Sequence, residues 1–154
     1  MPCFQSSVLT TTKKSLQGGA ATFVWADLVA LGDAVRREPL LGDALAVARA
    51  TMARAGQNVA HLAECLTRLG YDFDSPDAII TPPNAGLLTP VEWLDHRGGP
   101  LPLSLRAWYE MVGGVDFMGS HPTWDAREAD PLVVFPVELA VQECQDWQRW
   151  RDEE

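Results

Sequence analysis

The spacing of apolar residues predicts a helical N-terminal half. Apolar side chains recur at helical spacing from Phe23 to Arg37, which predicts a first helix that Pro39 ends. From Asp43 to Leu69 they recur three and four residues apart, which predicts one long helix that Asp43 and Gly70 cap. Its apolar positions are Leu45, Ala48, Met52, Ala55, Val59, Leu62, Leu66 and Leu69. We expect the two helices to pair as an αα-hairpin, and a coiled coil with a second chain is the alternative.

After the long helix the pattern changes to short elements separated by proline and glycine. Residues 71–73 predict a short extended segment, and residues 75–86, which contain three prolines, predict a loop. The run Thr89-Pro90-Val91-Glu92 is typical of a helix start, with threonine as the cap and proline in the first position. Gly98-Gly99 predicts the end of that short helix.

The stretch from Gly99 to Phe117 predicts a helix followed by a strand. Pro102 leads into a short helix. Ser104 can accept a hydrogen bond from the first free N–H groups of that helix. Gly113-Gly114 can take the left-handed conformation that ends a helix, and residues 115–118 then predict a strand. The apolar face of the helix comprises Leu105, Trp108, Tyr109 and Val112.

The C-terminal part predicts one more strand and one more helix. Leu132–Phe135 is rich in β-branched residues, which predicts a buried strand, and Val137–Trp150 predicts the final helix. The expected core contacts of this helix are Leu139, Val141, Cys144 and Trp147. Two strands are evident, at 115–118 and 132–135, and a sheet of two strands is marginal alone. The expected fold class is therefore α+β, with an αα-hairpin followed by short helices and a small sheet.

Composition and charge narrow the classes of partner. The chain has 154 residues, enough for one domain, and its formal net charge of -9 argues against nucleic acid and anionic membrane. An acidic surface instead suits a basic protein partner. Three scattered cysteines, at positions 3, 65 and 144, indicate reduced thiols and a cytoplasmic protein. Residues 1–20 are polar and predict a disordered leader before a single domain at 21–154, with a targeting peptide as the alternative.

The central stretch resembles a known superfamily. The residues Leu101-Pro102-x-Ser104-Leu105-x-x-Trp108-Tyr109-x-x-x-Gly113-Gly114 are similar to the signature of the SUKH superfamily, the Smi1/Knr4-like domains, in a bacterial branch. The resemblance implies an α+β fold and, as for many bacterial members, an immunity protein that binds and neutralises a toxin domain. Other members regulate cell-wall synthesis. Proteins of this branch continue past the last helix with more strands, so the resemblance also implies that the domain is incomplete at its C-terminal end.

Two groups of residues could carry chemistry. His61, Glu64 and Cys65 have metal-ligand spacing, but no second cluster completes a tetrahedral shell, so we expect no metal and no cofactor. Six residues gather around one acidic loop, and we interpret them as partner contacts: Asp116, His121, Trp124, Asp125, Glu128 and Asp130.

We expect no catalytic residue and no enzymatic activity, because no motif fixes a catalytic geometry in this sequence. The expected function is non-catalytic protein binding by a monomer or weak dimer. One alternative is a small metal-dependent hydrolase that uses the acidic loop. The other is a structural module that dimerises through the long helix.

Overall fold

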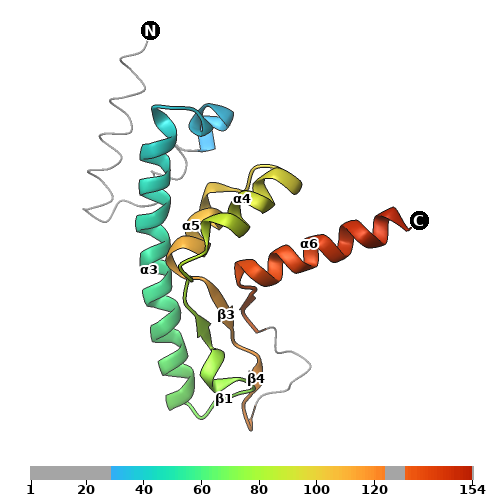
Figure 1. Ribbon diagram of the computed structural model, residues 1–154. Helices are drawn as coiled ribbons and strands as arrows, with labels where there is room; N and C mark the ends of the chain where they lie inside the picture. The colour runs from blue at the N-terminus through green and yellow to red at the C-terminus, as the bar shows by residue number, and fades with distance from the viewer. Residues whose placement is uncertain (1–28, 124–130, 154) are drawn as a thin grey trace. The chain divides into compact units, whose positions relative to one another are not determined.

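The computed structural model describes residues 29–123 and 131–153, which divide into two compact units, one ending at Thr51 and the other beginning at Met52. Four α-helices and five short antiparallel strands in this part of the chain confirm the expected α+β class (Figure 1). In chain order the elements are η1 (Gly32–Arg36), α3 (Leu40–Arg68), β1 (Asp72–Phe73), η2 (Pro76–Ala78), β2 (Ile80–Thr81), α4 (Leu88–Arg97), α5 (Leu103–Met111), β3 (Gly114–Asp116), β4 (Gly119–Ser120), β5 (Val133–Val134) and α6 (Val137–Asp152).

The first predicted helix does not run unbroken to Arg37. Val29 and Ala30 are helical, and the 3₁₀ helix η1 follows after a turn at Leu31. The physical reason is Gly32, whose φ of 50° is left-handed and ends a helix rather than continuing it. Residues 23–28 lie outside the described residues, and so does their part of the predicted pairing with α3.

The long helix is confirmed, with slightly different ends. It begins three residues before the predicted start and ends at Arg68. Gly70 has φ 87° and closes it, because its N–H donates to the carbonyl of Thr67 at 3.0 Å. The N–H of Tyr71 then donates to the carbonyl of Leu66, also at 3.0 Å. These two bonds form a Schellman motif, so the predicted glycine cap is correct.

The buried face of α3 differs from the predicted seam near its C-terminal end. Val59 and Ala63 are buried, whereas Leu62 is exposed and Leu69 retains 65% of its accessible surface. A strict heptad pattern drifts by about 20° per seven residues around a straight α-helix, which moves the buried face away from the last predicted positions. Met52 and Leu66 pack against the core cluster of the second unit, so this part of the seam serves an internal core.

The strands form two small antiparallel sheets. β1 pairs with β4, and the second sheet has the order β2-β3-β5. Val115 in β3 lies opposite Ile80 on one side and Val134 on the other. The predicted loop at 75–86 is therefore wrong in part, because it contains η2 and the strand β2. The β-branched Ile80 finds a partner in β3, and that tertiary pairing outweighs the prolines that follow it.

The strand β5 was expected to be buried, and this prediction is wrong. β5 pairs only with β3 among the described strands, so it forms an edge of the sheet. The large apolar side chains of Leu132, Val133 and Phe135 are exposed. Val134 packs against the buried core while its neighbours Val133 and Phe135 are exposed, because alternate residues of a strand point to opposite faces. Leu132 precedes the strand.

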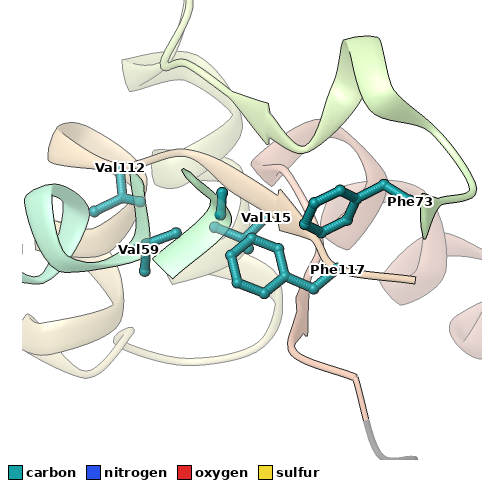
Figure 2. Packing of buried hydrophobic residues seen from close by; sticks show 6 residues of the cluster. Val59, Phe73, Val112, Val115 and Phe117 are labelled. Carbon is teal, nitrogen blue, oxygen red and sulfur yellow. The ribbon is translucent and has the colours of Figure 1, made fainter. Parts of the chain in front are cut away.

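The main core of the second unit lies between α3 and the strands. Phe73 and Phe117 lie next to each other in this core (Figure 2) and meet edge to face, with ring centroids 5.6 Å apart. The hydroxyl of Tyr71 donates to the carbonyl of Phe117 at 2.9 Å and so ties the end of α3 to the chain after β3. The buried members of this cluster are Val59, Ala63, Phe73, Val112, Val115 and Phe117.

A second cluster joins α4, α5 and α6. Its buried members are Val91, Leu94, Tyr109 and Val137. Val141 and Cys144 pack against it as predicted, and Leu139 is half-buried. The prediction that Trp147 is a core contact is wrong, because α6 extends beyond the cluster and the indole retains 56% of its accessible surface (Figure 1).

Three predicted N-terminal caps are not made. Asp43, the predicted cap of the long helix, lies inside α3, which begins at Leu40. α4 begins at Leu88, before Thr89, and α5 begins at Leu103, before Ser104, and neither helix has a side-chain cap bond. The backbone of residues 84–89 already turns before the threonine, since the Leu87 N–H donates to the Asn84 carbonyl. The predicted helix ends are correct: the N–H of Gly98 donates to the Leu94 carbonyl at 2.8 Å, and Gly113 has φ 87°.

Candidate functional site

The structure describes two of the six predicted partner contacts. Asp116 ends β3 and His121 follows β4. Trp124, Asp125, Glu128 and Asp130 lie outside the described residues. Asp116 and His121 belong to chain segments on different sheets, and each is held by local hydrogen bonds of its own.

Asp116 stabilises the turn that leads out of β3. Its Oδ1 accepts a hydrogen bond from the N–H of Met118 at 2.9 Å, two residues ahead. This is the bond by which an aspartate side chain mimics a backbone turn. Its own N–H donates to the carbonyl of Ile79 at 3.0 Å. One carboxylate oxygen is therefore engaged in positioning the chain between β3 and β4.

His121 connects the segment after β4 to the end of α3. Its Nε2 donates to the carbonyl of Leu69 at 2.9 Å, which satisfies a C-terminal carbonyl of the helix. Its Nδ1 accepts from the N–H of Thr123 at 3.2 Å and lies 2.9 Å from the Thr123 hydroxyl. A carbonyl only accepts and an amide N–H only donates, so in these two bonds Nε2 is the donor and Nδ1 the acceptor. Both ring nitrogens thus have structural partners.

The three residues with metal-ligand spacing lie on the surface of α3. The thiol of Cys65 lies 3.6 Å from Nε2 of His61 and accepts from Nη2 of Arg68 at 3.0 Å. Nδ1 of His61 is 3.8 Å from the carboxylate of Glu64. Among residues 29–123 and 131–153, no three histidine, cysteine or acidic side chains gather in a way that could hold a metal ion.

A small depression opens between the start of α6, the end of α5 and the loop after β2. It measures about 200 Å³, part of it open solvent. Asn84 donates from Nδ2 to the carboxylate of Glu138 and so links the loop after β2 to the first turn of α6. Tyr109 lines the depression, and burial raises the pKa of its hydroxyl above the ordinary value of 10.0.

The Tyr109 hydroxyl should lower stability at high pH. Above pH 10.0 the unfolded chain ionises this phenol while the folded chain still holds the proton, so the free energy of unfolding falls until the folded pKa is passed. Tyr109→Phe removes this loss. We expect urea midpoints of the two proteins to agree near neutral pH and to diverge above pH 10, with the phenylalanine variant more stable. Parallel profiles throughout would contradict a buried, raised phenol.

Two surface features went unrecognised in the sequence. One is the open edge of β5, with the exposed side chains of Leu132, Val133 and Phe135. The other is the C-terminal half of α6, where Trp147 and Trp150 retain 56% and 62% of their accessible surface. The signal for the second was present, because Glu143, Asp146, Trp147 and Trp150 follow one another three, one and three residues apart and so share one side of a helix.

Comparison of the chain with protein-family models, with curated proteins and with solved structures found no match. Along the described residues, no helix has both the length and the apolar character needed to cross a bilayer.

Proposed function

We propose that this chain is a non-catalytic protein-binding domain of SUKH type that binds a basic partner protein in the cytoplasm. The observation that carries the proposal is a set of large apolar side chains exposed on a strongly acidic chain. Exposed apolar patches mark interaction surfaces, and a net charge of -9 selects a partner of opposite charge. The same charge disfavours nucleic acid and anionic membrane as partners.

The edge of β5 provides the most direct support for protein binding. Leu132, Val133 and Phe135 expose apolar surface on either side of the inward-packed Val134, and β5 has a neighbour on only one side among the described strands. An edge strand presents unpaired backbone N–H and C=O groups to which another chain can hydrogen-bond. The combination of open backbone groups and apolar side chains suits a partner segment in extended conformation.

The SUKH resemblance suggests what the partner is. Many bacterial members are immunity proteins, so the partner in this proposal is a basic toxin domain that the chain neutralises by direct binding. The contacts predicted in the acidic loop remain part of the proposal: Asp116, His121, Trp124, Asp125, Glu128 and Asp130. The chain acts as a monomer or weak dimer, since the seam of α3 near Met52 and Leu66 serves an internal core.

Affinity capture from the native cell lysate tests this proposal. The tagged chain should retain one protein in stoichiometric amount, and mass spectrometry should identify a basic domain in it. Raising the salt concentration to about 1 M, where the Debye length is about 3 Å, should release that protein. Recovery of chaperones alone, or of an acidic partner that salt does not release, would contradict the proposal.

A further inference from the structure

The helix α6 has an outward face that no described element covers. Its inner face comprises Val137, Ala140, Val141 and Cys144, which pack on the second cluster. Successive residues of an α-helix are about 100° apart, so Glu143, Asp146, Trp147 and Trp150 lie within about 100° of one another, beside the inner face. Trp147, seven residues after Ala140, stands at the border between the two. Figure 1 shows α6 extending outward from its start near α4 to the C-terminus. We call these four residues the α6 outer face.

The α6 outer face is aromatic and acidic at once. Trp147 and Trp150 are three residues apart, the spacing at which side chains on a helix are neighbours. Both indoles keep more than half of their accessible surface, at 56% and 62%. Glu143 and Asp146 are also exposed. Tryptophan faces bind cations through their ring quadrupole, and carboxylates bind guanidinium in paired hydrogen bonds.

Arginines of the chain itself already contact one tryptophan and one carboxylate of this face. The guanidinium of Arg151 lies 5.0 Å from the ring centroid of Trp147. Nη1 of Arg149 lies 3.4 Å from Oδ1 of Asp146. Exposed pairs of this kind contribute little to stability, so an incoming arginine can displace them at small cost. The tryptophan and the carboxylate of this face therefore already bind guanidinium groups within the chain, which is the group we expect a ligand to present.

We propose that the α6 outer face docks an arginine-bearing segment of a partner protein. This inference rests on the proposed function, because it specifies how part of a basic partner is recognised. The negative net charge of the chain disfavours two other occupants of this face, a second copy of the chain and an anionic membrane. A second copy of the chain would bring together two molecules that each carry -9, and an anionic membrane would be repelled by the same charge.

Binding of a synthetic peptide tests the inference. The probe is a short peptide of alternating arginine and alanine, titrated into the full chain by calorimetry, with a glutamate–alanine peptide as the charge control. The Trp147→Ala/Trp150→Ala variant should bind the arginine peptide about tenfold more weakly, because two exposed cation–π contacts are lost. Trp147→Leu/Trp150→Leu should lose as much, since leucine keeps apolar surface without the aromatic ring.

The matched control is Gln142→Ala/Gln145→Ala, which changes exposed residues on another side of the same helix. It should bind like the wild type, and circular dichroism should show equal helix content in all variants. Wild-type binding that the tryptophan variants retain would overturn the inference and leave the proposed function standing. Failure of the wild type to bind the arginine peptide would also overturn it, whereas the proposed function is decided separately by the partner captured from lysate.

Two further results would assign the face to another occupant. Tryptophan-dependent binding to vesicles of zwitterionic lipid, with no response to the arginine peptide, would overturn the inference in favour of a membrane surface. A dimer in light scattering that Trp147→Ala/Trp150→Ala dissociates would overturn it in favour of self-association.

Discussion

Replacing Gly113 by alanine should destabilise this protein by about 4 kcal/mol, a large part of the roughly 5 to 15 kcal/mol by which folded domains are stable. Gly113 ends α5 with φ 87°, a conformation that side chains rarely adopt. A Cβ atom at this position would overlap the carbonyl oxygen of Thr81 and lie 3.0 Å from the carbonyl carbon of Pro82. Both neighbours are backbone atoms, so neither can rotate away. Urea unfolding followed by circular dichroism measures the loss.

Gly99 provides the matched control for this substitution. Its φ is 89°, nearly the same, but nothing lies within 4 Å of the position that a Cβ would take. Gly99→Ala should therefore cost only the backbone strain, about 1 kcal/mol. Equal losses for the two variants would show that the close approach of β2 to Gly113 does not matter for stability.

Phe117→Ala should have a comparable effect, about 3 to 5 kcal/mol. The side chain of Phe117 is 4% exposed and packs edge to face on Phe73, inside the cluster that joins α3 to the strands. Truncation removes this contact and leaves a cavity whose walls are held by α3 and β3. Thermal and urea unfolding should both shift, and the near-UV signal of the aromatic cluster should weaken.

Phe135 provides the control here, because the same change at an exposed position removes little packing. Its side chain is 48% exposed beside the edge strand β5. Phe135→Ala should cost less than about 1 kcal/mol. If Phe135→Ala instead proved as damaging as Phe117→Ala, the assignment of β5 to an open edge would be wrong.

Local signals in the sequence predicted most of the helices. The periodicity of α3, α5 and α6 is strong, and Gly70 and Gly113 mark helix ends because a left-handed residue is needed there. The strand β2 was missed because two residues carry no periodicity, and its pairing with β3 depends on a distant part of the chain. The burial of a helix position likewise depends on distant parts of the chain, so the spacing of apolar residues wrongly predicted that Leu62 and Leu69 are buried.

The candidate site was less predictable than the fold. The apolar pattern of α6 continues past Cys144, which predicts that Trp147 is a core residue. Trp147 is exposed because α6 extends beyond the helices that it packs on, and the sequence pattern of α6 contains no information about where those helices end. His121 was expected to contact a partner because it lies near acidic residues. Its hydrogen bonds to Leu69 and Thr123 depend on the tertiary position of α3, which local sequence does not specify.

The central claim, that an acidic domain binds a basic protein, is tested most directly by the association kinetics of the purified pair. The protein captured from lysate is mixed with the chain in stopped flow, and the association rate constant is followed as salt is raised. Electrostatic attraction predicts a rate constant that falls by at least about tenfold between low and high salt. A rate constant that does not change with salt would contradict the claim.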